Sequence, residues 1–199
     1  MVRFKICGLM RETDAEYVSA VLPDYAGMIF APNRRRTVSH ETARAIRQRL
    51  DSRVPLTGVF VNAETAEIAQ LVREDIIQLV QLHGQEDAAY LERLRASVNV
   101  PVIQAFRIGS ADDLAAAVRS AADYILLDNG AGGTGETFDW SLVRDIGRPF
   151  FLAGGLTPET VGEALRLHPF CLDVSSGVET DGYKDPAKIR AFAAAVRGA

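Results

Sequence analysis

The chain has 199 residues, of which 48% are hydrophobic and 24% charged, and its formal net charge is −4. This composition is ordinary for a globular protein, and the slight negative charge argues against a nucleic-acid partner. No stretch approaches the roughly 20 apolar residues of a membrane span, and the first residues lack the apolar run of a secretory signal. The two cysteines lie far apart in the sequence and suggest no disulfide framework. We therefore expect a cytoplasmic protein without a membrane partner.

Short apolar runs alternate with amphipathic stretches along the whole chain. The apolar runs predict strands at 4–7, 26–30, 56–61, 78–82, 101–106, 124–127, 150–153 and 171–174. The amphipathic stretches predict helices near 13–21, 40–50, 63–72, 87–96, 110–121, 157–167 and 185–196, and a short one from Trp140. Capping patterns support five of these starts: Thr13 or Asp14, Ser39, Ser110 with Asp113, Thr157-Pro158 and Asp185-Pro186.

Strict alternation of strands and helices implies parallel strands joined by helical crossovers. Eight such units close naturally into a (β/α)₈ TIM barrel, so we expect residues 1–199 to form a single barrel domain. The alternative is a doubly wound open sheet. A dinucleotide-binding sheet of that type would carry G-x-G-x-x-G after its first strand, whereas Cys7-Gly8-Leu9-Met10 stands there.

The longest connection in this pattern begins at Asp128. This carboxylate ends an apolar run, Tyr124-Ile125-Leu126-Leu127, and the glycine-rich stretch 129–138 follows it. The alternative interpretation is a glycine-rich turn whose aspartate caps the next helix. Long loops in compact domains are usually functional or disordered, and we favour a loop that covers a bound substrate.

The active site of such a barrel lies at the carboxyl ends of its strands. The chain places the following polar or small residues there: Cys7, Arg34 to Arg36, Gln81, His83, Asp128, Gly154 and Gly155, Asp173, and Ser175, Ser176 and Gly177. Phosphate commonly binds at the loops after the seventh and eighth strands. Gly154, Gly155, Ser175, Ser176 and Gly177 occupy those loops, so we expect their amide groups to hold a phosphate.

Cys7 and Asp128 are the candidate pair for proton transfer. A thiolate is a good base and a carboxylic acid a good proton donor when the pKa of each is tuned. Lys5 faces the same side of the strand as Cys7 and could lower the pKa of the thiol. The alternative for Cys7 is an inert buried thiol, and we interpret Cys171, at the start of its strand, as a packing residue.

Two further features at the strand ends indicate substrate binding. A guanidinium from Arg34, Arg35 or Arg36 would pair well with a substrate carboxylate, although these arginines could also form only a solvated basic loop. His83 stands at the rim of the barrel, where it is either a binding residue or a structural histidine.

These residues together resemble the phosphoribosylanthranilate isomerase family of tryptophan biosynthesis, over about residues 3–197. The resemblance is carried by Lys5-Ile6-Cys7-Gly8, the basic loop to Arg36, Gln81-Leu82-His83-Gly84, Leu126-Leu127-Asp128, Gly132-Gly133-Thr134-Gly135 through Asp139-Trp140, Ala153-Gly154-Gly155-Leu156 and Asp173-Val174-Ser175-Ser176-Gly177-Val178-Glu179. It implies a (β/α)₈ barrel that works without a cofactor or metal. It also implies the Amadori rearrangement of N-(5-phosphoribosyl)anthranilate to 1-(2-carboxyphenylamino)-1-deoxyribulose 5-phosphate.

The resemblance also implies roles for individual residues. Asp128 would be the general acid that protonates the furanose ring oxygen, and Cys7 the general base that removes the C2 proton. Arg36 would hold the anthranilate carboxylate, with Arg34 and Arg35 as alternatives because three arginines stand together. His83 and Asp173 would contact or orient the sugar.

Three other functions compete with this interpretation. The related aminoaldose isomerase of histidine biosynthesis would use an aspartate where Cys7 stands, and would need a second phosphate site. Indole-glycerol-phosphate synthase would need a catalytic lysine at a strand end. A catalytically idle sugar-phosphate binder is the third, because a fold does not prove an activity. In each case the partner is a small molecule, and the chain is expected to be a monomer or a homodimer.

Overall fold

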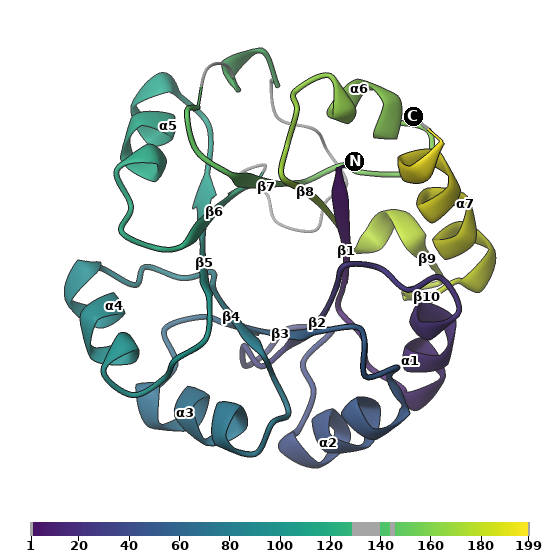
Figure 1. Ribbon diagram of the computed structural model, residues 1–199, viewed down its shortest axis with the longest axis horizontal. Coiled ribbons are helices and arrows are strands. Elements are labelled where there is room, and N and C mark those ends of the chain that lie inside the picture. The colour runs from purple at the N-terminus through teal and green to yellow at the C-terminus, as the bar shows by residue number, and fades with distance from the viewer. Residues whose placement is uncertain (1, 129–139, 144–145, 199) are drawn as a thin grey trace.

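Eight parallel strands close into a barrel in the computed structural model, which describes residues 2–128, 140–143 and 146–198 (Figure 1). The strands are β1 (Arg3–Cys7), β2 (Tyr25–Ile29), β3 (Leu56–Phe60), β4 (Leu79–Leu82), β5 (Val102–Arg107), β6 (Tyr124–Asp128), β7 (Phe150–Ala153) and β8 (Cys171–Val174). Strand β1 pairs with β2 on one side and with β8 on the other, which closes the ring. The predicted (β/α)₈ barrel is therefore confirmed, and each predicted strand is present to within about two residues.

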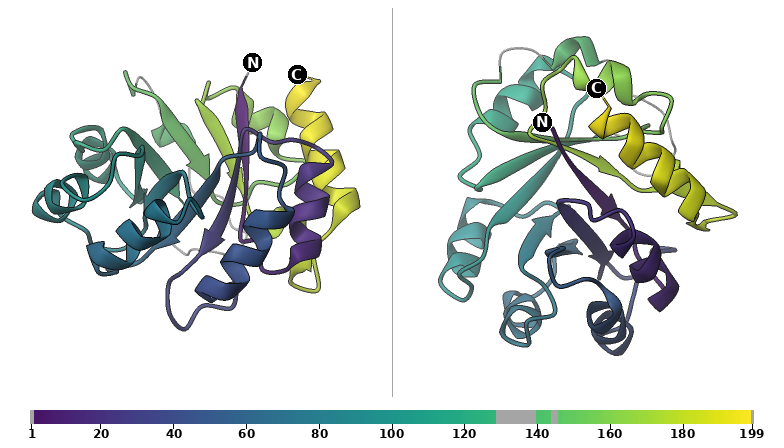
Figure 2. Two further views of the ribbon diagram at one scale, coloured as in Figure 1. Left: turned by 60° about the horizontal axis from the view of Figure 1, so that its bottom comes forward. Right: turned by 45° about the vertical axis from the view of Figure 1, so that its right-hand side comes forward.

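Helices form an outer ring around the strands, and the views of Figure 2 show them on the outside of the barrel. They are α1 (Glu12–Ser19), α2 (His40–Arg49), α3 (Thr65–Arg73), α4 (Ala88–Arg95), α5 (Ala111–Val118), α6 (Val161–Leu165) and α7 (Pro186–Arg197). Between β6 and β7, the described residues contain the 3₁₀ turn η1 (Trp140–Leu142), at the place where the sequence predicts a short helix.

Three of the five predicted capping patterns act as the sequence indicates. The Ser39 hydroxyl oxygen accepts the N–H of Thr42 at the start of α2, and Asp185 accepts the N–H groups of Ala187 and Lys188 at the start of α7. Ser110 and Asp113 form the predicted reciprocal cap of α5. Such side-chain acceptors satisfy helix N–H groups that have no partner in the first turn.

The starts of α1 and α6 differ from the prediction. Helix α1 begins at Glu12 with Arg11 at the N-cap, because the carboxylate of Asp14 reaches back to the backbone N–H groups of Met10 and Arg11. In α6, Thr157 does not cap the helix. Its hydroxyl oxygen accepts the N–H of Glu159, which closes a separate turn, and the helix starts only at Val161.

A small hairpin after β8 is absent from the prediction. It follows the 3₁₀ turn η2 (Ser176–Val178) and consists of β9 (Glu179–Thr180) and β10 (Tyr183–Lys184). Asp181 and Gly182 join the two strands with φ angles of 51° and 82°. Positive φ at both central residues is the signature of a type I′ turn, and Asp-Gly is a favoured sequence for it.

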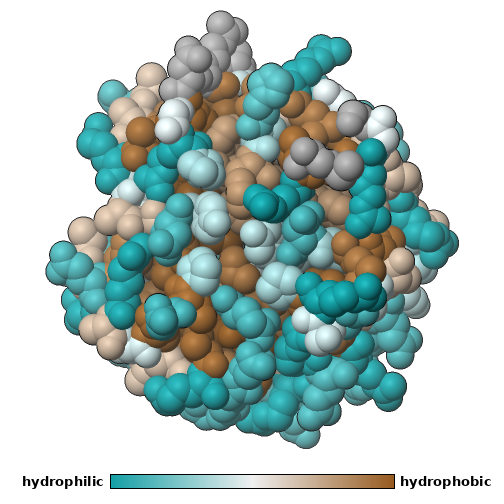
Figure 3. Space-filling view, viewed as in Figure 1, coloured by the Kyte–Doolittle hydropathy of each residue, from teal (hydrophilic) through white to brown (hydrophobic). Residues whose placement is uncertain are grey.

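The strands separate two apolar cores. Inside the barrel, a layer of buried apolar side chains includes Leu79, Ile103, Leu126, Phe151 and Cys171. A larger core lies between the outer faces of the strands and the helices. Figure 3 shows hydrophilic side chains around the outer edge of one end of the molecule and hydrophobic ones between them. No helix within the described residues is long and apolar enough to cross a membrane.

Candidate active site

The predicted site residues meet at one end of the barrel. Cys7 and Asp128 are the last residues of β1 and β6, and His83 follows β4 directly. Asp173 lies in β8, paired in register with Lys5 of β1. Because all eight strands are parallel, their carboxyl ends share one rim, where barrel enzymes carry their active sites. The glycine-rich loop predicted to cover this rim, 129–138, lies outside the described residues.

A buried ion pair joins β1 and β8 inside the barrel, just below the rim. The Lys5 ammonium is fully buried and donates to Oδ2 of Asp173 at 2.8 Å and to Oε1 of Gln81 at 2.9 Å. Burial disfavours the charged ammonium, but the charges and hydrogen bonds of Asp173 and Cys7 together outweigh this effect and raise the pKa of Lys5. The second oxygen of Asp173, Oδ1, is buried and has no hydrogen-bond partner among the described residues. A substrate hydroxyl could satisfy this acceptor.

The Cys7 thiol is buried, with 7% of the residue exposed, and it is not in a disulfide. Burial raises its pKa above the ordinary thiol value, since desolvation disfavours the thiolate. The positive charge of Lys5 acts in the opposite direction, as the sequence suggests, and Lys184 adds to it. In the free protein, however, burial is the larger effect, so the expectation of a thiol with a lowered pKa is not met.

His83 and Asp128 face each other across the rim. Nε2 of His83 lies 3.4 Å from Oδ2 of Asp128, and Nδ1 of His83 lies 3.2 Å from Nε2 of Gln81. The Asp128 side chain is 11% exposed and that of His83 29%, so both remain accessible from the mouth of the barrel. The imidazole therefore connects a rim carboxylate to the buried polar groups beneath it.

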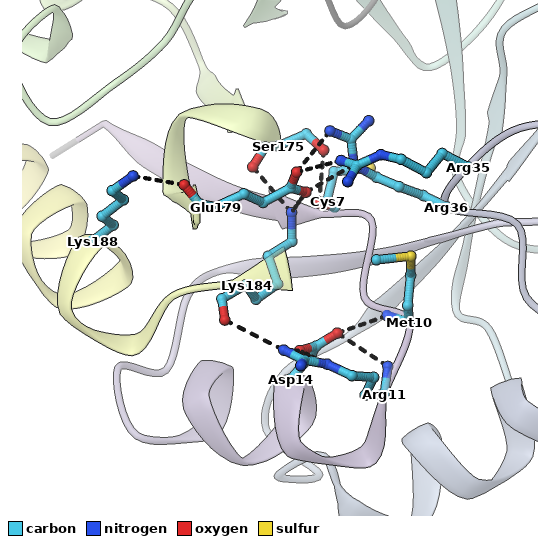
Figure 4. A network of polar contacts seen from close by, with 10 residues as sticks. All are labelled: Cys7, Met10, Arg11, Asp14, Arg35, Arg36, Ser175, Glu179, Lys184 and Lys188. Carbon is cyan, nitrogen blue, oxygen red and sulfur yellow. Dashed lines mark hydrogen bonds and ion pairs between the residues drawn. The ribbon is translucent and has the colours of Figure 1, made fainter. Parts of the chain in front are cut away.

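Arg36 is held in place by Glu179, at the start of the hairpin that the sequence analysis missed (Figure 4). Its Nε and Nη2 atoms donate to the two carboxylate oxygens of Glu179, each at 2.8 Å. A Cβ placed on Gly8 would lie 2.7 Å from Cδ of Arg36, so the side chain passes directly over the residue after Cys7. This contact brings one of the three consecutive arginines to the mouth of the barrel.

Lys184, from the other strand of the hairpin, completes this cluster. Its buried ammonium donates to Oε1 of Glu179 at 2.7 Å and to the backbone oxygen of Ser175 at 3.0 Å. Burial opposes ionisation of Glu179, but the hydrogen bonds from Arg36 and the charge of Lys184 hold its pKa at about 2. Glu179 is therefore ionised at neutral pH and fixes the direction of the Arg36 guanidinium.

The other two arginines are more exposed than Arg36. Arg34 is exposed. Arg35 also donates to Glu179, at 2.7 Å, but its side chain is 54% exposed and its Nη1 atom lies against Gly182 in the turn of the hairpin. The corresponding side-chain exposure of Arg36 is 15%. Among the three, Arg36 has the most fixed guanidinium and the position nearest Cys7.

The two loops predicted to bind phosphate are packed against each other. Gly154 and Gly155 follow β7 with φ angles of 85° and 66°, which favour glycine. A Cβ on Gly177 would lie 1.8 Å from the carbonyl oxygen of Leu156, so the loop after β8 contacts the loop after β7 directly. The Ser175 hydroxyl donates to the backbone oxygen of Cys7 at 3.1 Å, which ties this loop to the end of β1. The hydroxyl proton of Ser175 is thus already used within the protein.

We expect Gly177→Ala to disturb both loops, because the added methyl group would overlap the backbone of Leu156. Overpacking of this kind costs about 1–3 kcal/mol of stability, and the displaced loops should also raise KM for a phosphorylated substrate. Thermal unfolding and steady-state kinetics measure the two effects. Gly162→Ala in α6 is the matched control, since a Cβ there meets nothing within 4 Å. Equal KM values for the two variants would contradict this role of the loops.

A polar hollow of about 310 Å³ lies between the loops after β3 and β4, and is lined in part by Asn62, Gln85, Glu86 and Tyr90. Glu86 accepts the backbone N–H groups of Asn62 and Gly84, so its carboxylate serves to join the two loops. Within the described residues, no cluster of three His, Cys, Asp or Glu side chains could hold a metal ion.

Sequence reasoning identified part of this site. It placed Gln81 at the rim and Lys5 beside Cys7, where Lys5 could lower the pKa of the thiol, but gave neither residue a substrate-binding or catalytic role. A two-residue period along β1 and β4 is the signal, because alternate side chains on a strand share a face. Glu179 stood within a recognised motif without a role. Lys184 was missed together with the hairpin, although Asp181-Gly182 is a hairpin signal.

Comparisons with known proteins agree with the geometry. The family model described as N-(5'phosphoribosyl)anthranilate (PRA) isomerase matches residues 4–195. The N-(5'-phosphoribosyl)anthranilate isomerase of Endomicrobium trichonymphae is 43% identical over 95% of each chain. The crystal structure of phosphoribosyl anthranilate isomerase from Thermotoga maritima is 38% identical over the whole of both chains, with a TM-score of 0.91. A crystal structure of phosphoribosyl anthranilate isomerase in complex with reduced 1-(o-carboxyphenylamino)-1-deoxyribulose 5-phosphate is 36% identical over all of both chains, with a TM-score of 0.88.

Proposed function

The chain belongs to the N-(5'-phosphoribosyl)anthranilate isomerase family of tryptophan biosynthesis, and we propose that it carries out the Amadori rearrangement of this substrate with Asp128 as general acid and Cys7 as general base. The observation that most supports this proposal is the position of both groups at the rim of one barrel, at the ends of β6 and β1. Each is buried, yet borders a mouth lined by groups that suit a sugar phosphate with a carboxylate.

The first step is the opening of the furanose ring. The protonated carboxyl group of Asp128 donates its proton to the ring oxygen and the bond from this oxygen to C1 breaks. The lone pair of the anthranilate nitrogen forms a C1=N double bond at the same time, which gives an iminium. His83 faces the carboxylate that is left, at 3.4 Å, and can stabilise it with an N–H donor. Proton donation in this step avoids a free alkoxide as leaving group.

In the second step, the Cys7 thiolate removes the proton from C2. The iminium withdraws electrons from the C2–H bond, so the product is an enolamine with a C1=C2 double bond. The positive charges of Lys5, of Lys184 and of the iminium itself favour the thiolate over the thiol. Protonation at C1 and loss of the C2 hydroxyl proton then give the ketone, and no atom is gained or lost overall.

Arg36 holds the anthranilate carboxylate in this proposal. Glu179 occupies its Nε and Nη2 atoms, which leaves the Nη1 end of the guanidinium for the substrate. The ligand named for one related isomerase carries a carboxylate and a phosphate. Arg36 would hold the carboxylate, the loops at Gly154-Gly155 and Ser176-Gly177 the phosphate, and Asp173 and His83 would contact the sugar.

We expect Arg36→Lys to raise KM by roughly 10- to 100-fold and to change kcat less, because lysine keeps the charge but loses the planar guanidinium that Glu179 orients. Arg35→Lys is the matched control, since Arg35 contacts the same carboxylate from an exposed position. Steady-state kinetics of the two variants decide between the arginines. A larger increase in KM for Arg35→Lys would assign the substrate carboxylate to Arg35.

The reaction is tested by the loss of substrate fluorescence when the purified protein is added. The labile substrate is made in place from anthranilate and phosphoribosyl pyrophosphate by the preceding transferase, whose metal is chelated before the isomerase is added. A decay much faster than the spontaneous rate supports the proposal. If decay stays at the spontaneous rate with folded protein, the bisphosphorylated aminoaldose of histidine biosynthesis is the next substrate to assay, and an idle sugar-phosphate binder remains if that also fails.

A further inference from the structure

A chain of polar contacts connects the buried lysine to the proposed acid. The Lys5 ammonium donates to Oε1 of Gln81 at 2.9 Å, Nε2 of Gln81 lies 3.2 Å from Nδ1 of His83, and Nε2 of His83 lies 3.4 Å from Oδ2 of Asp128. The four residues come from β1, β4 and β6, and from the position directly after β4. In the proposed mechanism Lys5 acts only through its charge beside Cys7, and Gln81 has no role.

Only one assignment of donors and acceptors is possible along this series of contacts. An ammonium can only donate, so the side-chain oxygen of Gln81 must face Lys5 and its NH₂ group must face His83. The NH₂ group is a donor, so Nδ1 of His83 must accept. In a neutral imidazole the ring proton is then on Nε2, the nitrogen that lies 3.4 Å from Oδ2 of Asp128.

We infer that Lys5 and Gln81 are positioning residues that select this tautomer of His83 and thereby determine which oxygen of Asp128 delivers the proton. With Oδ2 beside the protonated nitrogen of the imidazole, the transferable proton resides on Oδ1 and is available to the substrate. This inference rests on the proposed role of Asp128 as general acid. Catalytic hydrogen bonds are often long without substrate, and we expect the 3.4 Å contact to shorten when substrate binds.

The ion pair between Lys5 and Asp173 fixes this assignment of donors and acceptors. Asp173 holds the Lys5 ammonium at 2.8 Å, and both groups are buried, so the lysine stays in place as a charged donor. Rotation of the Gln81 amide by half a turn would place its NH₂ group against the ammonium, donor against donor. A buried pair of donors without an acceptor is costly, so the Gln81 orientation follows from the position of Lys5.

The test is the protonation pattern of His83 in protein labelled with ¹⁵N-histidine, assigned by comparison with His83→Asn. We expect a protonated Nε2 and an unprotonated Nδ1 at neutral pH. In Gln81→Glu, a carboxylate accepts from both neighbours, so Nδ1 should become protonated, and kcat should fall by roughly 10- to 100-fold with KM changed much less. Gln85→Glu is the matched control, because it makes the same substitution at an exposed position two residues after His83.

Gln81→Met keeps the inference testable if the glutamate variant does not fold. Methionine removes the donor to Nδ1 without adding a charge, so both tautomers of His83 should appear. A protonated Nδ1 in the unmodified protein would overturn the inference, and so would an unchanged tautomer in both Gln81 variants. The spectra need no substrate. If the spectra show the expected tautomer while Asp128→Asn keeps full activity, the role of Asp128 as general acid is contradicted and the tautomer of His83 is confirmed.

Discussion

Asp128→Asn should lower kcat by a factor of about 10²–10⁴, the usual contribution of a general acid, and should leave KM nearly unchanged. Asparagine keeps the shape of the side chain and can still accept from His83, but it has no acidic proton for the ring oxygen. The substitution therefore separates the acid function from the packing at the end of β6.

The matched control for this variant is Asp112→Asn, which removes one carboxylate from the exposed first turn of α5. Its kcat and KM should equal those of the unmodified protein. Thermal unfolding of both variants establishes that each is folded. If Asp128→Asn turned over at the rate of the control, another group would have to protonate the ring oxygen.

Cys7→Ser should likewise lower kcat by about 10²–10⁴, since a serine hydroxyl is a far weaker base than a thiolate. Cys171→Ala provides the control, because Cys171 is the second buried thiol and lies at the opposite end of its strand, in the apolar layer inside the barrel. That variant should keep its kcat and lose only some stability. Equal losses of kcat in both variants would indicate a packing effect.

The pH dependence of the thiol follows from its burial. Burial raises the pKa of Cys7, so the thiolate of the free protein should form only at pH values above the ordinary thiol pKa of about 8.5. Ultraviolet absorbance of the thiolate measures this, with Cys7→Ser subtracted. A thiolate at neutral pH in the free protein would contradict the dominance of burial.

The sequence predicts the fold and several site residues, because these residues stand at the carboxyl ends of the predicted strands. Cys7, Asp128 and His83 were found from the alternation of apolar runs alone, since parallel strands bring their last residues to one rim. The contacts that orient these groups are harder to predict. Glu179 and Lys184 depend on a hairpin with two-residue strands, which is too short to show a hydrophobic period.

The predicted starts of α1 and α6 were wrong for the same physical reason. Short polar side chains near a helix start can serve several backbone N–H groups, so a capping pattern locates a start without fixing its residue. Asp14 reaches back from inside α1, and Thr157 closes a turn ahead of α6. Neither error moves a site residue, because the rim is determined by the strands.

The central claim is that Asp128 opens the ring and Cys7 then removes the C2 proton. The most direct test uses substrate with deuterium at C2 in single-turnover fluorescence decays. Cys7→Ser should show a larger primary isotope effect than the unmodified protein, because proton removal becomes the slow step. Asp128→Asn should show a smaller effect, because ring opening becomes slow. An isotope effect that is the same in both variants would contradict this division of roles.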